Sequence, residues 1–220
     1  MHPTHEQLSE QFRLQDQLNS RINPEWPTAH YKWTRAMFVE ATEMLDHIGW
    51  KWWGSQKSDV EQAQLELVDI WHFILSHDLA RCEGEADRAI VKLIDAAKHP
   101  QDTVFIGYAP TTLSHMDTQE LIEAFVALAA GGIVSITAFQ LLMEKLSLTW
   151  DALHRMYMAK NVLNIFRQMH GYKSGTYIKT WMGKEDNEVL TDLITARPTA
   201  TAEQLFNKLE TIYTTVKETQ

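Results

Sequence analysis

The chain has 220 residues, 45% of them apolar and 22% charged, a composition typical of a globular protein that buries a core within one large domain. With 20 basic and 29 acidic residues its formal charge is −9, which would repel a phosphate backbone and disfavours binding to nucleic acid polymers. The single cysteine, Cys82, cannot form an internal disulfide, and no leader peptide or membrane-spanning run is evident, so we expect a cytoplasmic protein.

Apolar residues recur at three-and-four spacing along nearly the whole chain, and no segment has the strict alternation typical of a strand. This pattern predicts an all-α fold, a compact helical bundle with a core of four or five helices and a smaller helical appendage. The expected helices cover residues 4–19, 28–48, 58–81, 84–98, 117–130, 133–146, 149–170, 186–195 and 201–217. Capping-box spacing marks four helix starts, at Thr4 with Gln7, Ser58 with Glu61, Asp117 with Glu120, and Thr201 with Gln204.

The domain organisation follows from these helices and the segments between them. We expect one main domain at residues 1–195, in which residues 100–146 form a mobile helical insert. A C-terminal helix within residues 196–220 is expected to pack on the same domain. The tryptophan-rich segment 49–57 and the glycine-containing segment 171–184 are candidate site loops.

Two pairs of acidic residues lie on the apolar sides of the second and third expected helices. Glu40 and Glu43 are three residues apart, as are Glu66 and Asp69, so each pair shares one helical face. Most pairs at this spacing are solvated or paired with lysine or arginine, but apolar residues share these two faces. Clustered buried carboxylates take up protons or recruit a cation. We therefore expect the four acids to bind Mg²⁺, which prefers oxygen ligands and leaves places for water and phosphates.

A basic segment, residues 160–184, contains no acidic residue and five cations: Lys160, Arg167, Lys173, Lys179 and Lys184. Lys160, Asn164 and Arg167 are spaced four and three apart, which would project two cations and an amide from one helical face. Gly171 and Gly175 would let the backbone approach a phosphate closely. The segment could be only a surface patch that pairs with the acidic remainder. Beside an acidic metal cluster, however, it favours a site for a polyphosphate.

Several strings of the sequence resemble one enzyme family. The acidic pairs have the spacing ExxE and ExxD, and they occur together with the segments Gly49–Trp53, Glu66–Phe73, Lys160–Trp181 and Gly183–Asn187. Together these resemble the dimeric all-α dUTPases, which belong to the superfamily of all-α nucleotide pyrophosphohydrolases, over about residues 15–187. The acidic pattern marks the whole superfamily, whereas the string KNxLNxFRQxxGYKxGxY is much more specific.

The resemblance implies a homodimer that hydrolyses dUTP, with dUDP as a further candidate, to dUMP and pyrophosphate or phosphate by a metal-activated water. It implies two or more Mg²⁺ ions, with Mn²⁺ as a substitute, held by Glu40, Glu43, Glu66 and Asp69. Glu40 and Glu43 would be catalytic, Glu40 by orienting or deprotonating the attacking water. The phosphate-binding residues would be Lys160, Asn164, Arg167, Tyr172, Lys173 and Lys179. The base- and sugar-binding residues would be Gln15, Asn19, Trp53, His72 and Phe73.

The implied roles at the nucleoside differ from residue to residue. The amides of Gln15 and Asn19 would recognise uracil, and Trp53 would help to close the base pocket. His72 would lie near the 3′-hydroxyl, and Phe73 would pack against the sugar where a 2′-hydroxyl would clash. Each of these residues could instead be an ordinary core or surface side chain.

Three other functions stay open on the sequence. A dCTP or dual dCTP and dUTP pyrophosphatase of the same superfamily fits, because amides can be oriented to suit either base. A di-iron carboxylate oxidoreductase is suggested by Asp69 and His72, three apart on a helix, although such sites usually have Glu-x-x-His on two helices and no second copy is found. A non-catalytic helical interaction module would leave the buried acids unexplained.

Overall fold

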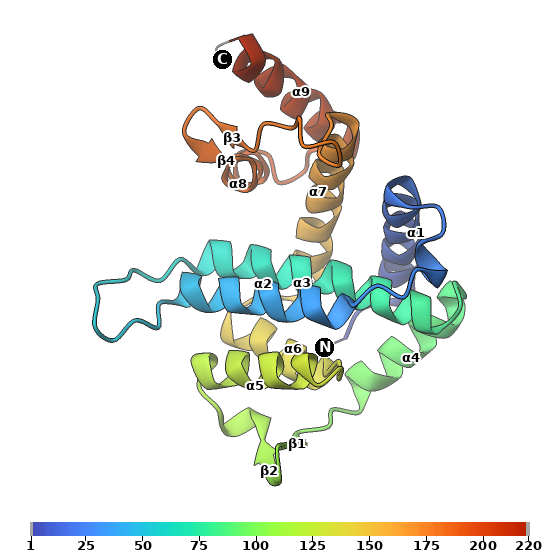
Figure 1. The fold of residues 1–220 in the computed structure, drawn as a ribbon, viewed down its shortest axis with the longest axis vertical. Helices are drawn as coiled ribbons and strands as arrows, with labels where there is room; N and C mark the ends of the chain where they lie inside the picture. Colours follow the sequence, from blue (N-terminus) through green and yellow to red (C-terminus); the bar gives the residue numbers. More distant parts are fainter. Residues whose placement is uncertain (1, 219–220) are drawn as a thin grey trace.

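A computed structural model describes residues 2–218 and has the expected all-α architecture (Figure 1). The helices are α1 (His5–Ile22), α2 (Trp33–Ile48), α3 (Val60–Arg81), α4 (Ala86–Lys98), α5 (Thr118–Ala130), α6 (Ile136–Lys145), α7 (Trp150–Met169), α8 (Asp186–Ala196) and α9 (Ala202–Glu218). Residues 1, 219 and 220, to which the expected main domain and C-terminal segment extend, lie outside the described residues.

The helix starts agree with their capping signals at three of four places. Thr4 and Asp117 form capping boxes with Gln7 and Glu120, and Thr201 and Gln204 exchange the corresponding hydrogen bonds. The expectation at Ser58 is wrong by one residue, because the Asp59 carboxylate accepts from the Gln62 amide and begins α3.

The second helix begins at Trp33 rather than at residue 28. A 3₁₀ turn, η1 (Trp26–Thr28), occupies the expected first turn, and His30 has a φ of 50°, which is incompatible with a right-handed helix. A second 3₁₀ turn, η2 (Leu113–His115), precedes α5. Because α2 begins at Trp33, Trp26 and Tyr31 lie on the segment between α1 and α2, where both line a cavity described below.

Two small hairpins contradict the expectation of no strands. Strands β1 (Thr103–Ile106) and β2 (Ala109–Thr112) pair antiparallel, and β3 (Thr180–Trp181) pairs with β4 (Lys184–Glu185). Each hairpin turns through two residues, and Gly107 and Gly183 supply the positive φ that such turns require.

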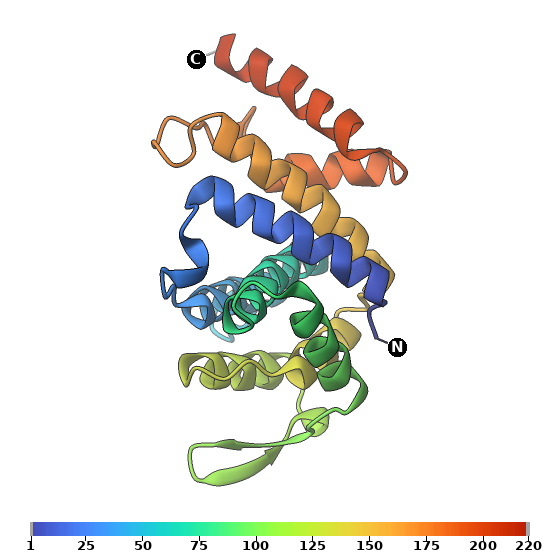
Figure 2. The ribbon, with the colours of Figure 1, turned by 90° about the vertical axis from the view of Figure 1, so that its right-hand side faces the viewer.

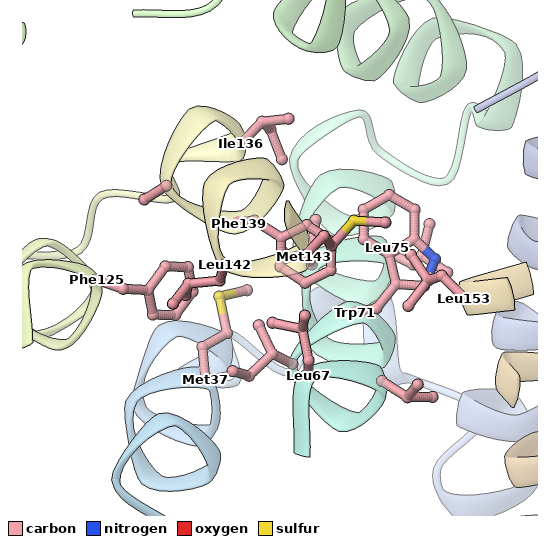
Figure 3. Close-up of a cluster of buried hydrophobic side chains, with 14 of the residues drawn as sticks. Met37, Leu67, Trp71, Leu75, Phe125, Ile136, Phe139, Leu142, Met143 and Leu153 are labelled. Atoms are coloured by element: carbon pink, nitrogen blue, oxygen red, sulfur yellow. The ribbon is translucent and has the colours of Figure 1, made fainter. Parts of the chain in front are cut away.

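The largest hydrophobic core surrounds α3. Figure 1 shows α2 and α3 side by side with α5 along α2, and Figure 3 shows the side chains that these helices share with α6 and α7. Trp71 of α3 stacks on Phe139 of α6 with ring centroids 5.2 Å apart. Met37, Leu67 and Leu142 are fully buried in the same cluster. On α3 the polar residues Glu66, Asp69, His72 and Ser76 share one helical face.

A second core lies at the C-terminal end of α7. Leu163 and Phe166 of α7 pack with Trp181, with Leu190 of α8 and with Leu209 of α9. The first half of α7 packs in the α3 core and along α1, and Figure 2 shows α1 crossing beside α7. The polar face of α3 therefore lies among α1, α2 and α7. Within the described residues, no helix combines the length and the apolar character that crossing a membrane requires.

Candidate active site

Three of the four acids of the ExxE and ExxD pairs meet between α2 and α3. Carboxylate oxygens of Glu40, Glu43 and Glu66 all lie within 4.8 Å of one another. Among the described residues, no lysine or arginine pairs with any of the three, and the nearest base is the Nε2 of His47, 3.3 Å from Glu66. Burial, and next the charge of Asp69, raise the pKa of Glu40 to about 8 and that of Glu66 to about 7. The cluster thus holds more negative charge than its surroundings stabilise.

The fourth acid, Asp69, is neutralised from α7. Lys160, which is fully buried, places its Nζ 2.7 Å from the Asp69 carboxylate and donates to the Asn187 side chain over 2.8 Å. The expectation of four converging acids therefore holds for three of them by geometry, while Asp69 lies beside them in an ion pair. Three clustered carboxylates, with the pKa raised at Glu40 and Glu66 and with no lysine or arginine paired to them among the described residues, fit a hard divalent cation.

Arg167 joins the basic segment to α8. Its Nε and Nη2 donate to the two oxygens of Asp186 over 2.8 and 2.7 Å, and Nη1 donates to Asn164 over 3.1 Å. A further bond of 3.0 Å runs from Nη2 to Asn187, and the Tyr177 hydroxyl donates to Asp186 over 2.7 Å. Burial would raise the pKa of Asp186, but the Arg167 guanidinium outweighs it and lowers this pKa. The guanidinium is thereby held in one orientation.

Two cavities meet at these residues. The first, about 540 Å³ and here called the aromatic cavity, lies against α1, α3 and α7 and is lined by residues that include Trp26, Tyr31, Trp33, Phe73, Gln15, Asn19, His72 and Asn164. The second, about 560 Å³ and here called the acidic cavity, is lined by residues that include Glu43, His47, Asp59, Glu66, Lys179, Glu185 and Asn187. Both are lined by Glu40, Asp69, Arg167 and Tyr172. One ligand with an aromatic end and an anionic end could therefore occupy both.

The polar side of the aromatic cavity is a hydrogen-bond network. The Gln15 Oε1 accepts from His72 Nδ1 over 2.7 Å and from the Tyr157 hydroxyl over 3.0 Å. The Gln15 Nε2 donates to Asn19 Oδ1 over 3.1 Å and to Ser76 Oγ over 3.0 Å. Asn19 Nδ2 also donates to Ser76 Oγ, over 2.9 Å, and the Ser76 hydroxyl donates to the His72 carbonyl. Burial lowers the pKa of His72 to about 4, so its ring is neutral.

The residues expected at the site occupy different positions. Gln15, Asn19, His72, Phe73, Asn164 and Tyr172 line the aromatic cavity as a group. Lys179 lines the acidic cavity but is paired with Glu185 at 2.9 Å. Lys173 lines neither cavity and donates to the Ile22 carbonyl. Trp53 also lies away from both, 60% exposed in the segment between α2 and α3, where it contacts Trp50 and Trp52 edge to face.

The residues of the site that were not expected from the sequence include His47, Ser76, Tyr157, Asp186 and Asn187. The first three carried a signal from spacing, since His47 follows Glu43 by four, Ser76 follows His72 by four and Tyr157 precedes Lys160 by three, each on a shared helical face. Asp186 and Asn187 lie in one of the segments that carry the resemblance, but helical periodicity gave no indication of their contact with α7, because a hairpin brings them there.

A family model described as dUTPase matches residues 7–172, which include most of α1, the whole of α2 and α3, all the lining of the aromatic cavity and all four acids. The match ends before Lys179, Asp186 and Asn187. No curated protein matches the chain.

Proposed function

The chain belongs to the all-α dUTPase family and is a dUTP diphosphatase, and from this premise we propose that it is a Mg²⁺-dependent enzyme that hydrolyses dUTP to dUMP and pyrophosphate. The observation that carries the metal dependence is the convergence of Glu40, Glu43 and Glu66 without a cationic partner among the described residues. The aromatic cavity beside the cluster suits a nucleoside, and the acidic cavity with its cations suits the phosphates and their metal.

The metal ligands in this proposal are Glu40, Glu43, Glu66 and Asp69, with two or more Mg²⁺ ions and Mn²⁺ as a substitute. When bound, the metal neutralises the acids and the phosphates and lowers the pKa of coordinated water. Lys160 neutralises Asp69 without a bound metal, because its ammonium group forms an ion pair with that carboxylate from the buried side. Asp69 then keeps its orientation whether or not phosphate is present.

Glu40 is the residue that we assign to the attacking water. It lines both cavities and therefore lies at the boundary between the nucleoside end and the anionic end. From this position its carboxylate orients a water toward a phosphorus and accepts the proton that the water loses. Glu43 supports Glu40 from one turn further along α2, within the same cluster of oxygens.

Arg167 is the principal phosphate-binding side chain of the proposal. Four of its five N–H groups donate hydrogen bonds to Asp186, Asn164 and Asn187 within the described chain. One N–H therefore remains for a ligand. Because the other four fix the guanidinium, this remaining donor is preorganised. Tyr172, Lys179 and Asn164 extend the same surface. Lys160 and Lys173, which line neither cavity, complete the proposed phosphate-binding set through their charge.

For the nucleoside we propose Gln15, Asn19, His72 and Phe73, which line the aromatic cavity, with Trp53 contributed by a loop that is exposed in the single chain. The ring of Phe73 lies 6.3 Å from that of Trp33 and lines the cavity that the amides and Glu40 also line. In the proposal it packs against the sugar.

We also propose that the protein is a homodimer. Trp50, Trp52 and Trp53 are all exposed on the segment that projects beyond α2 and α3 in Figure 1, and Trp52 is 89% exposed. Aromatic side chains in such number are enriched in interfaces. Light scattering during size exclusion should give twice the chain mass, and Trp52→Ala should reduce it; a wild-type monomer would contradict the proposal.

The test of the function is a substrate panel of dUTP, dUDP, dCTP, dTTP and UTP, with Mg²⁺ or with EDTA. Pyrophosphate and nucleoside monophosphate are separated chromatographically. We expect dUTP to be the preferred triphosphate, pyrophosphate to appear with dUMP, and EDTA to abolish turnover. Full activity in EDTA would refute the metal dependence. Equal or higher turnover of dCTP would favour the dual pyrimidine enzyme of the same superfamily.

A further inference from the structure

Helix α9 lines neither cavity, yet it packs against α7 and β3 at the end of the molecule where Figure 1 also shows β4 and α8. Residues 176–179 pass through the same region as irregular backbone that leads from the turns after α7 to β3. They include Lys179, which lines the acidic cavity. The family match ends at residue 172 and covers neither this segment nor α9. The contacts that hold residues 176–179 therefore determine where Lys179 lies.

The side chain of Tyr213, on α9, holds the middle of this segment. It is 1% exposed, and its hydroxyl oxygen accepts a hydrogen bond from the Ile178 amide over 3.0 Å. Irregular backbone has no helix or ladder partner, so this side-chain oxygen takes the place of a backbone carbonyl. The Ile178 carbonyl accepts from the indole nitrogen of Trp181 over 2.8 Å. Both polar backbone groups of Ile178 are thus bonded to buried aromatic side chains.

The ring of Tyr213 also supports Tyr177, the residue before Ile178. The two rings stack with centroids 5.2 Å and planes 20° apart. On other sides the Tyr213 ring contacts Phe166 of α7 and Trp181, with centroids 5.3 and 5.2 Å away. Aromatic pairs at such separations stabilise a fold beyond the burial of their area. Tyr213 is therefore held in place itself and gives Tyr177 a fixed support.

The two neighbours of Ile178 both bond to Asp186. The Tyr177 hydroxyl donates to Asp186 Oδ2 over 2.7 Å, and the Lys179 carbonyl accepts from the Asp186 amide over 3.0 Å. Burial, and next the charge of Asp186, raise the pKa of Tyr177 far above its ordinary value, so its hydroxyl keeps the hydrogen that it donates. The same Oδ2 accepts from Arg167 Nε over 2.8 Å. A continuous series of contacts thus leads from Tyr213 to the Arg167 guanidinium.

We propose that Tyr213 is a positioning residue for the phosphate end of the substrate, which acts by holding residues 177–179 and, through Asp186, the guanidinium of Arg167. The inference rests on the proposed phosphate-binding roles of Arg167 and Lys179. Without the hydroxyl the Ile178 amide loses its acceptor, and both contacts to Asp186 become weaker while the ring packing stays. The cavity-lining residues proposed for the nucleoside lie on α1 and α3, so binding at that end should not change.

The first test compares the two ends of the substrate, through inhibition of dUTP hydrolysis by inorganic pyrophosphate and by deoxyuridine. Tyr213→Phe keeps the ring and removes the hydroxyl. We expect the inhibition constant of pyrophosphate to increase by about fivefold to tenfold, the effect of one lost hydrogen bond, and that of deoxyuridine to stay constant. The KM for dUTP should increase with pyrophosphate, at nearly constant kcat.

Leu209→Val is the matched control for packing. It removes one methylene from a fully buried side chain of α9, one turn before Tyr213, and leaves the hydroxyl in place. Both inhibition constants should equal those of the wild type. A purely structural role of α9 predicts the same change in Leu209→Val as in Tyr213→Phe, or equal changes in the two constants, and either result would overturn the inference.

A double-mutant cycle with Tyr177→Phe tests the route through Asp186. This variant removes the hydroxyl that donates to Asp186 and keeps the ring that stacks on Tyr213. Its pyrophosphate constant should also increase, and the two changes should not multiply in the double variant, because both act on the same carboxylate. Fully multiplicative effects would show that Tyr213 does not act through Tyr177 and Asp186.

The position of Arg167 can also be measured without substrate, from its Nε–H signal in ¹H–¹⁵N spectra of the ligand-free protein, with Arg167→Lys to assign it. We expect a sharp, slowly exchanging signal in the wild type and in Leu209→Val, because the buried Asp186 accepts this hydrogen. In Tyr213→Phe it should broaden or exchange faster, and an unchanged signal would contradict the inference. A wild type that pyrophosphate does not inhibit would refute the proposed phosphate site, while this signal still decides whether Tyr213 positions the guanidinium.

Discussion

The aromatic and acidic cavities share four lining residues but are stabilised in opposite ways. In the aromatic cavity most polar groups bond to one another, and among the described residues the buried Nε2 of His72 is the exception in this network. In the acidic cavity Glu40, Glu43 and Glu66 repel one another, and no lysine or arginine of the described residues pairs with them. The network of the aromatic cavity thus stabilises the folded chain, whereas the acids of the acidic cavity destabilise it. Activity and stability should therefore respond to mutation in opposite directions on the two sides.

The largest expected effect is a loss of activity without a loss of stability when an acid of the acidic cavity is neutralised. Glu43→Gln removes one charge of the repelling cluster without changing its shape, so turnover of dUTP should fall by about 10³-fold or more. In EDTA the free energy of unfolding should stay constant or increase, because the repulsion decreases. Steady-state kinetics and urea denaturation check this. Glu123→Gln, on the exposed face of α5, serves as the control, and a destabilised Glu43→Gln protein would contradict the comparison.

The junction of the two cavities should be the most sensitive to loss of a charge partner. Asp186→Ala leaves the Arg167 guanidinium buried without its carboxylate, which should cost about 3–5 kcal/mol of unfolding free energy. The exposed pair of Lys184 and Asp192 has the same 2.7 Å separation, yet Asp192→Ala should lower the free energy of unfolding far less, because water screens this pair. Equal losses in the two variants, measured by urea denaturation, would show that burial does not govern this ion pair.

The aromatic cavity should be weakened by acid through His72. Burial holds the pKa of its ring at about 4 in the folded chain against an ordinary value of 6.5, so the unfolded chain binds more protons between these values. The contribution of His72 to stability should therefore be constant above pH 6.5 and decrease as the pH falls to 4, by about 3 kcal/mol. The difference between wild type and His72→Asn across this range isolates the contribution, and parallel curves would contradict it.

The smallest effect is the stabilisation of the acidic cavity by metal. At about ten times its dissociation constant, Mg²⁺ should add about 1.4 kcal/mol, which raises Tm by about 3–6 °C for a chain of this size. Thermal denaturation with Mg²⁺ and with EDTA measures it. The increase should be absent in Glu43→Gln, whereas Tyr157→Phe should keep it, because that change lies on the aromatic side. A similar increase in Glu43→Gln would place the ion elsewhere.

Most of the fold could be predicted from the sequence because helical periodicity and capping are local signals. The hairpin of residues 103–112 was missed although its turn, Gly107 with Tyr108, has the Gly-X form of a two-residue loop. Pro110 in β2 cannot donate to a ladder, and the strands are too short for alternation to be distinct. The start of α2 was missed because the left-handed backbone at His30 has no residue-type signal.

Site residues that share one helical face could be predicted from the sequence. Contacts to the site from other helices could not. The acids of α2 and α3 could be found from spacing and apolar neighbours. The sequence could not show that only Asp69 is paired with a lysine, since Lys160 contacts it from another helix. The same holds for the amides of α1: the sequence indicates that Gln15 and Asn19 share a face, but only the structure shows that Ser76 and Tyr157 contact Gln15 from other helices.

Helix α7 contributes its first half to one hydrophobic core and its second half to the other, with Lys160, Asn164 and Arg167 near or beyond the midpoint. Because each end of α7 packs in a different core, a displacement of one end also moves the residues between the two cores. Fraying of the α8–α9 unit would therefore displace Asn164 and Arg167 before it reached the α3 core. Backbone amide exchange along α7 should accordingly show a gradient of protection, slowest at Leu153 and fastest beyond Phe166.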